Sequence, residues 1–351
     1  MRLIFAIPCD LASLTGGYRY DRELMARLSE YRIGVIHCQM PGSFPHPTTD
    51  DLRAAVHAVN AAISPGDIVL MDGLAYGVFP EAAIRAMKAP IIALCHHPLG
   101  LETGLQQERS RALLNSERKA LGLAARVVAT SAFTARTLEQ EFDVPAVRIS
   151  VALPGTEAAS RAQGSGGPPV LLAIGSITPR KAFNILIEAL ESISDIDWQL
   201  RIVGGAHHSP ETAAALQELI ESSGLSSRVK CLGELYGAAL DDNFHRSDVF
   251  VSSSLYEGYG MALSEAMARG LPIVTSTGGA AAETVPDNAA LKVPPGDVAA
   301  LGEALRRIIL DKALRDGLSE ASWRAGQNLP SWGDTAGAVA RVVKEVALAS
   351  Q

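Results

Sequence analysis

Short apolar runs alternate with longer amphipathic stretches through the first 155 residues of the chain. The apolar runs predict strands at residues 3–7, 33–38, 68–71, 91–95, 126–129 and 149–152. The amphipathic stretches predict helices at residues 18–29, 50–63, 80–88, 102–121 and 132–142, and Ser131 is a suitable N-cap for the last of these. Strands that are apolar almost throughout, with helical spacers between them, indicate a parallel sheet covered on both faces.

The same alternation begins again after a stretch rich in Pro, Gly, Ala and Ser at residues 153–169. It predicts strands at 170–174, 198–203, 229–232, 249–251, 272–275 and 291–293, helices at 182–193, 211–223, 238–245 and 298–310, and a last helix at 331–348. We therefore expect an N-terminal Rossmann-like domain (1–155), a linker (156–169), a C-terminal Rossmann-like domain (170–330) and a terminal segment (331–351). Two such α/β domains predict a cleft lined by the carboxyl ends of their strands, where ligands of these sheets bind.

Composition agrees with a compact two-domain α/β protein and argues against other classes. Of the 351 residues, 48% are hydrophobic and 20% are charged, which is typical of folded proteins and not of disordered ones. The net charge of −7 argues against nucleic acid as the main partner. Residues 1–155 carry 15 basic and 15 acidic residues, and the remainder carries 16 and 23, so peripheral membrane contact is expected through the N-terminal domain if at all.

The first residues and the cysteines indicate the cellular compartment in which the protein is expected. Residues 2–7 are too short and too poorly flanked for a signal peptide, and no apolar run approaches the length needed to span a bilayer. The four cysteines show no paired spacing, so we expect free, buried thiols in a reducing environment. The expected location is the cytoplasm, with peripheral contact at the inner membrane face left open.

The most informative stretch is 249–275, in which a predicted strand, a loop, a helix and a second strand follow one another. Glu257 lies in the loop, and Glu265 lies about one turn into an otherwise apolar helix. A carboxylate in such a helix needs a partner, because burying an unpaired polar group costs roughly 2–7 kcal/mol. Gly258 and Gly260 allow a close backbone approach to a ligand, and the helix start offers free N–H groups to an anion.

Two residue pairs follow predicted strands of the N-terminal domain. Gly16-Gly17 lies between the first strand and its helix, where it either turns the chain tightly or exposes backbone N–H groups to a phosphate or sugar. His96-His97 follows the strand at 91–95, where a histidine either makes ordinary loop hydrogen bonds or contacts a sugar hydroxyl.

A basic pair, Arg180-Lys181, lies near the start of a predicted helix in the C-terminal domain. Cations are disfavoured at a helix N-terminus, so a bound diphosphate would explain both side chains. The alternative is a solvated basic pair.

Glu257-Gly258-Tyr259-Gly260 followed by Glu265 resembles the signature of the family 4 glycosyltransferases, which are retaining enzymes of GT-B architecture. The resemblance extends over nearly the whole chain through looser matches. These are Gly204-Gly205, Gly278-Gly279 with Glu283, residues 294–297, and Ser331-Trp332. It implies two Rossmann-like domains with parallel sheets facing across a cleft, and a C-terminal helix that crosses back to the N-terminal domain.

The resemblance also implies roles for the candidate residues. Glu257 contacts the donor sugar, and Glu265 contacts the ribose hydroxyls of the nucleotide. His96 lies near the transferred sugar as a catalytic residue, and His97 contributes to the acceptor pocket. The other implied donor-binding residues are Gly16, Gly17, Arg180, Lys181, Gly258, Tyr259, Gly260 and Met261.

The chain departs from the family pattern at one place. Ser176 stands where the family usually has an arginine after the glycine, and Lys181-Ala182 replaces the usual Lys-Gly. Arg180 is therefore the candidate substitute for the missing arginine, and which cation meets which phosphate stays open.

The implied reaction is transfer of a hexose from a nucleotide-diphosphate sugar to an acceptor hydroxyl, with retention of configuration and without a metal or other cofactor. Two alternatives remain: a sugar-nucleotide-binding subunit without turnover, which Ser176 favours, and a GT-B sugar-nucleotide epimerase. The base, the sugar and the acceptor are not specified by the sequence.

Three further patterns are assigned no site. Residues 195–197 have the Asp-x-Asp form but precede a strand. His207-His208 lacks a carboxylate or cysteine at ligand spacing in the sequence, so no metal is expected there. The basic helix around residues 109–119, which includes Glu117, is expected to be a solvated face.

Overall fold

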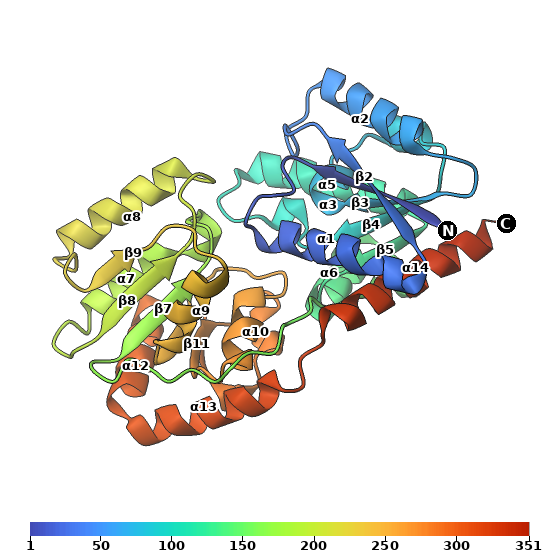
Figure 1. Ribbon diagram of the computed structural model, residues 1–351. Helices are drawn as coiled ribbons and strands as arrows, with labels where there is room; N and C mark the ends of the chain where they lie inside the picture. Colours follow the sequence, from blue (N-terminus) through green and yellow to red (C-terminus); the bar gives the residue numbers. More distant parts are fainter. Residues whose placement is uncertain (351) are drawn as a thin grey trace. The chain divides into compact units, whose positions relative to one another are not determined.

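The computed structural model describes residues 1–350, which form two compact units. Unit 1 comprises Met1–Gly155 and the chain from Pro330 onwards, and unit 2 comprises Thr156–Leu329. Each unit contains one six-stranded parallel sheet with helices packed around it (Figure 1). The α/β class and the parallel sheets predicted from the apolar pattern are confirmed.

The sheet of unit 1 has the strand order β2-β1-β3-β4-β5-β6. Its strands are β1 (Arg2–Pro8), β2 (Gly34–Met40), β3 (Ile68–Asp72), β4 (Ile91–Cys95), β5 (Arg126–Ala129) and β6 (Ile149–Val151). Its longer helices are α1 (Gly16–Arg27), α2 (Thr49–Ala62), α5 (Gln107–Leu123), α6 (Ala132–Phe142) and α14 (Trp332–Ala349), and the shorter ones are α3 (Gly73–Tyr76) and α4 (Glu81–Arg85). The central strands are buried on both faces, which explains their unbroken apolar runs.

The sheet of unit 2 has the strand order β12-β11-β10-β7-β8-β9. Its strands are β7 (Val170–Ile174), β8 (Gln199–Val203), β9 (Val229–Cys231), β10 (Val249–Ser252), β11 (Ile273–Ser276) and β12 (Ala290–Val293). Its helices are α7 (Phe183–Glu191), α8 (Pro210–Ser222), α9 (Gly237–His245), α10 (Met261–Ala268), α11 (Ala281–Thr284), α12 (Val298–Leu310) and α13 (Lys312–Gly326).

The last helix, α14, belongs to unit 1 although it follows unit 2 in the chain. Ser331 caps it in a capping box with Asp334. The Tyr31 hydroxyl donates to the carbonyl of Gly333 at 2.7 Å, and the Thr335 hydroxyl donates to the carbonyl of Leu153 at 2.7 Å. These bonds attach α14 to the rest of unit 1.

Residues 156–169 contain no helix or strand and belong to unit 2. The Ala162 N–H donates to the carbonyl of Arg269 at 2.9 Å, and the Asp248 carboxylate accepts from the N–H groups of Ser165 and Val170. This irregular segment therefore lies against the body of unit 2.

Some local predictions were right and others were wrong. Ser131 does cap α6, since its side chain accepts from the N–H of Thr134 at 2.9 Å. The helix expected from residue 102 begins only at Gln107, because Gly104 adopts a positive φ of 86° that a helix cannot contain. Helix α13 was not predicted, because only Leu318 and Ser322 of its residues are buried and it has no regular apolar stripe.

The cysteines and Glu117 also differ from expectation. All four cysteines are free and Cys38 and Cys95 are buried, but Cys231 is exposed because β9 is the edge strand of its sheet. Glu117 of α5 is buried at 2% exposure, so that helix does not present a wholly solvated charged face. Among the described residues, no helix has both the length and the apolar character needed to cross a bilayer.

Candidate functional site

Two clusters of candidate residues lie at the carboxyl edges of the sheets, one in each unit. In unit 2, the neighbouring strands β7, β10 and β11 each end in a loop that carries candidate residues. These loops lie together because the carboxyl ends of parallel strands share one edge of the sheet.

The Glu257 carboxylate is the centre of the unit 2 cluster. Its side chain is 8% exposed, and its Oε1 lies 2.5 Å from Nζ of Lys181 and its Oε2 lies 3.6 Å from Nη1 of Arg180. The Ser254 hydroxyl donates to Oε1 at 2.6 Å. The structure thus brings together the basic pair and the carboxylate, two features that were singled out separately in the sequence.

The electrostatic state of Glu257 follows from these contacts. Burial alone would raise its pKa, but the charges of Lys181 and Arg180 and the hydrogen bonds from Lys181 and Ser254 outweigh burial and lower the pKa to about 2. Glu257 is therefore ionised at neutral pH, with the basic side chains of Lys181 and Arg180 beside it.

Backbone bonds fix the loops that carry these side chains. The Leu255 N–H donates to the carbonyl of Arg180 at 2.8 Å, and the Ser253 hydroxyl donates to the carbonyl of Lys181 at 3.0 Å. The short 3-10 helix Pro179–Lys181 that follows β7 is thereby tied to the loop that follows β10. These bonds hold the two loops together, so the backbone sets the positions of the basic pair and of Glu257.

The glycine pair after β11 holds Glu257 in place. The Glu257 N–H donates to the carbonyl of Gly278 at 3.2 Å, and its own carbonyl accepts from the N–H of Ala280 at 2.8 Å. A Cβ added at Gly278 would lie 2.2 Å from the Leu255 carbonyl oxygen, and one at Gly279, which has a φ of 62°, would lie 2.4 Å from the Glu257 carbonyl oxygen. Only glycines allow this close approach.

The remaining donor-site candidates lie at the start of α10. Gly260 is the N-cap, with a φ of 95°, and Tyr259 before it is buried. Met261 and Glu265 are half-buried, and Gly258 is also half-buried. Glu265 thus lies in the first turns of an otherwise apolar helix, as the sequence indicated, and its side of α10 is partly open.

In unit 1, the candidates gather around His96, which follows β4. The Gly16-Gly17 pair forms the first residues of α1, and a Cβ at Gly17 would lie 3.6 Å from Cδ2 of His96. Neither glycine has a positive φ, so the tight-turn explanation of this pair is wrong. A Cβ at Gly17 would only make ordinary van der Waals contact with the imidazole, so the start of α1 lies next to His96.

Two carboxylates that sequence reasoning missed hold His96. Its Nε2 lies 3.3 Å from Oδ1 of Asp21 and 3.3 Å from Oδ2 of Asp72. Asp21 is a buried acid on α1, and Asp72 is the last residue of β3. An acid on the apolar face of a predicted helix and an acid at the end of a predicted strand are the sequence features that could have pointed to them. His97 lies apart from this cluster, with its Nε2 3.7 Å from Oε2 of Glu102.

The carboxylates set the charge of His96. Burial would lower its pKa, but the hydrogen bonds and charges of Asp21 and Asp72 outweigh it and raise the pKa. The ring is therefore an imidazolium at neutral pH, and it retains a second N–H, at Nδ1, for another acceptor.

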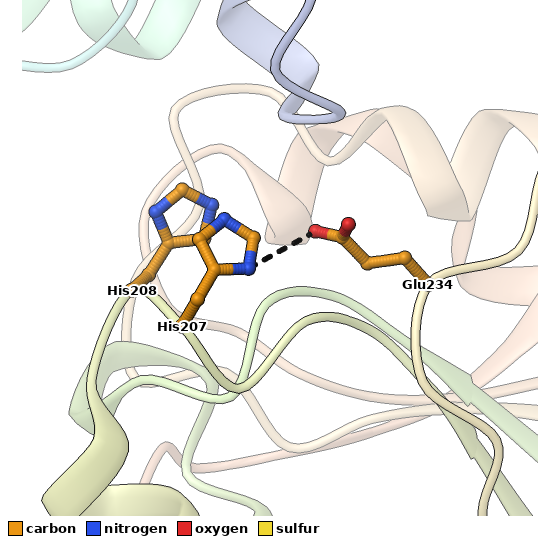
Figure 2. Close-up of side chains that lie close together, drawn as sticks. All are labelled: His207, His208 and Glu234. Atoms are coloured by element: carbon orange, nitrogen blue, oxygen red, sulfur yellow. Dashed lines mark ion pairs between the residues drawn. The ribbon is translucent and has the colours of Figure 1, made fainter.

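The sequence patterns that were set aside have different outcomes. Asp195 forms an ion pair with Arg306 of α12, which agrees with a structural loop at residues 195–197. The expectation that no carboxylate accompanies His207-His208 is wrong. Glu234, distant in sequence, lies beside His207, with 3.6 Å between Oε1 and Nδ1 (Figure 2).

Comparison with known proteins gives two family matches in succession. The model of Glycosyltransferase Family 4 matches residues 51–159, and that of Glycosyl transferases group 1 matches residues 156–324. Together they extend over most of both units.

Curated relatives are similar over part of their length. Mannosylfructose-phosphate synthase of Agrobacterium fabrum is 29% identical over 46% of this chain and 37% of its own. D-inositol 3-phosphate glycosyltransferase of Nocardia farcinica is 30% identical over 63% of this chain and 52% of its own. The matched regions thus amount to about half the length of these relatives or less.

Solved structures share the whole fold. Sucrose-phosphate synthase from Thermosynechococcus elongatus superposes with a TM-score of 0.84 at 20% identity, covering 99% of this chain and 100% of that one. Anabaena HepE in complex with UDP-glucose gives a TM-score of 0.74 at 18% identity, with both chains fully covered. These likenesses identify the GT-B fold, and with the two family matches they lead to one conclusion: the chain belongs to the family 4, or group 1, glycosyltransferases.

Proposed function

We propose that this chain is a retaining glycosyltransferase that moves a hexose from a nucleotide-diphosphate sugar to an acceptor hydroxyl without a catalytic metal. The observation that carries the proposal is the cluster of Arg180, Lys181 and Glu257 at the carboxyl edge of the unit 2 sheet. Acceptor recognition is assigned to unit 1.

The cluster suits a diphosphate for electrostatic reasons. Arg180 and Lys181 place two basic side chains at this edge, and their N–H groups are suited to the oxygens of a phosphate. The start of α10 at Gly260 adds backbone N–H groups that have no partner within the helix. The structural relative HepE was solved in complex with UDP-glucose, which supports a nucleotide-sugar donor for this chain.

The leaving group gives these residues their catalytic role. Glycosyl transfer has an oxocarbenium-like transition state, in which the departing diphosphate gains negative charge. Arg180, Lys181 and the α10 N-terminus would stabilise that charge in place of a metal, and loss of one such contact would cost about 2.7–4 kcal/mol in the barrier. Attack on the same face as departure, with the leaving phosphate as the base, would retain the configuration.

Glu257 and Glu265 have different proposed roles in the donor site. Glu257 lies beside Lys181 and is assigned to the donor sugar. Glu265 is half-buried about one turn into α10 and is assigned to the ribose hydroxyls. In unit 1 the His96 imidazolium is assigned to a sugar hydroxyl and His97 to the acceptor.

The test separates binding from turnover. Glu257→Ala should abolish transfer while nucleotide still binds, because the cations remain. Glu265→Ala should mainly weaken nucleotide binding. Binding is measured by calorimetry with UDP-, GDP-, ADP- and dTDP-sugars, and turnover by release of the nucleotide diphosphate.

Glu303→Ala, on an exposed position of α12, is the matched control and should change neither quantity. Near-normal turnover of Glu257→Ala would overturn the catalytic assignment. Nucleotide-sugar binding without turnover on any acceptor would instead favour a binding subunit, and a changed sugar without an acceptor would reveal an epimerase.

A further inference from the structure

Two loops of unit 2 bring two imidazoles and a carboxylate together (Figure 2). His207 and His208 lie in the loop after β8, and Glu234 lies in the loop after β9. The ligand atoms of the three side chains all lie within 4.8 Å of one another. All three residues are exposed, so an ion can reach them from solvent.

The backbone around this cluster is fixed. The Gly204 N–H donates to the carbonyl of Gly233 at 2.8 Å, which joins the two loops directly. The Ile177 N–H donates to the carbonyl of Gly205 at 2.8 Å, which attaches the same loop to the chain after β7. The anchored loops hold the three side chains side by side at little additional cost in backbone entropy.

Gly205 makes the room that the cluster occupies. A Cβ there would lie 2.3 Å from Oε1 of Glu234 and 2.9 Å from Cε1 of His207, so no larger residue fits without moving both side chains. The His207 and His208 rings lie side by side, with 4.0 Å between their centroids. The carboxylate and the rings therefore share one small volume.

The chemistry of these groups suits a transition-metal ion, because imidazole and carboxylate are common ligands of such ions. Two imidazoles and one carboxylate form the three-ligand set of many open zinc sites, with solvent as the fourth ligand. Ligand atoms around tetrahedral zinc lie about 3.3 Å apart, given metal–nitrogen bonds of about 2.0–2.1 Å, and exposed side chains reach this spacing by small rotations.

We propose that His207, His208 and Glu234 bind one divalent transition-metal ion, for which Zn²⁺ fits the ligand set best. None of the three residues is among those assigned to the donor, so the metal is not assigned a step in glycosyl transfer. Hard cations such as Mg²⁺ should bind poorly, because imidazole is a weak ligand for them.

The test is metal binding by the full-length, untagged chain. Titration with Zn²⁺ near neutral pH should show saturable binding of one ion at this site, and Co²⁺ should give the visible absorption of a tetrahedral centre. Binding should be lost when the pH falls below the usual pKa of histidine, because protonated imidazole is not a ligand. Mg²⁺ should give no comparable signal.

Matched variants locate the ion. His208→Ala and Glu234→Gln should each weaken Zn²⁺ binding at least about tenfold, since loss of groups that merely orient metal ligands already costs about 10- to 100-fold. His57→Ala, which removes an exposed histidine of α2 in unit 1, should leave the affinity unchanged. Circular dichroism checks that each variant is folded.

Two other places in the chain offer metal ligands and need controls. Cys231 is exposed at the end of β9, and Asp21, Asp72 and His96 of unit 1 also bring ligand atoms together. Cys231→Ser should keep the Zn²⁺ affinity of the wild type. The proposal is overturned if the wild type shows no saturable binding, or if the double variant His207→Ala/His208→Ala binds Zn²⁺ as the wild type does.

Discussion

Replacing Glu257 with glutamine tests the charge cluster of unit 2 most directly. The substitution keeps the shape of the side chain and removes the charge that Lys181 contacts at 2.5 Å. The Lys181 ammonium would then lose the carboxylate that it contacts in a partly buried site. We expect unit 2 to lose stability for this reason.

The pKa of Glu257 sets the size of the loss. A fall from the usual 4.5 to about 2 in the folded state corresponds to about 3.4 kcal/mol, at about 1.36 kcal/mol per pKa unit. Removing one partner of a buried ion pair costs a similar 3–5 kcal/mol, roughly. We therefore expect Glu257→Gln to lower the free energy of unfolding of unit 2 by about 3 kcal/mol near neutral pH.

The sign of the pH dependence follows from linkage. Because the folded pKa lies below the unfolded one, the stabilisation by Glu257 is fully present above the unfolded pKa and is lost as the pH falls through the folded pKa. The difference between wild type and variant should shrink to about 1.4 kcal/mol near pH 3.

The measurement must resolve unit 2 from unit 1, because a two-unit chain does not give a single free energy of unfolding. Guanidinium unfolding followed by pulsed hydrogen exchange, read from peptides of β7 and β10, provides this. Glu303→Gln, on the exposed side of α12, is the control and should stay within about 0.5 kcal/mol of the wild type. A loss below about 1 kcal/mol near neutral pH, or the same loss near pH 3, would refute the reasoning.

Two further predictions concern a glycine at a close backbone contact in unit 2 and a buried carboxyl group in unit 1. Gly278→Ala should displace the loop that carries Glu257, because its Cβ would lie 2.2 Å from the Leu255 carbonyl oxygen, so calorimetry should show nucleotide-sugar affinity reduced by about tenfold or more. Gly317→Ala is the matched control, since its Cβ meets no atom within 4 Å, and equal affinities for the two variants would contradict the prediction. Burial raises the folded pKa of Glu117 to about 8, so the wild type should lose stability as the pH rises from the unfolded value of about 4.5 to about 8. Thermal unfolding of Glu117→Gln should lack this decline, and parallel curves for the two proteins would show that Glu117 does not cause it.

The sequence alone determined the features that depend on neighbouring residues. Apolar runs separated by amphipathic helices predicted two parallel-sheet units, and the cap at Ser131 could be read from a single residue. Glu257, Gly260 and Glu265 were found together because they lie within one loop and the first turns of one helix. Local periodicity and turn chemistry are properties of the chain itself.

Tertiary structure decided which distant residues meet. The strand order β11-β10-β7 places Lys181 beside the Glu257 carboxylate and the Gly278 carbonyl beside the Glu257 N–H. No local sequence pattern encodes that strand order. The same holds for Asp72 beside His96 in unit 1 and for Glu234 beside His207 in unit 2.

Burial likewise depends on packing. Glu117 belongs to a charged helix in sequence, yet it is enclosed against the backbone of Leu99 and Gly100, whereas Cys231 was expected to be buried but is exposed on an edge strand. Sequence patterns record what each segment can form, but the charge and environment of a side chain depend on segments distant along the chain, which become its neighbours only when the sheet is assembled.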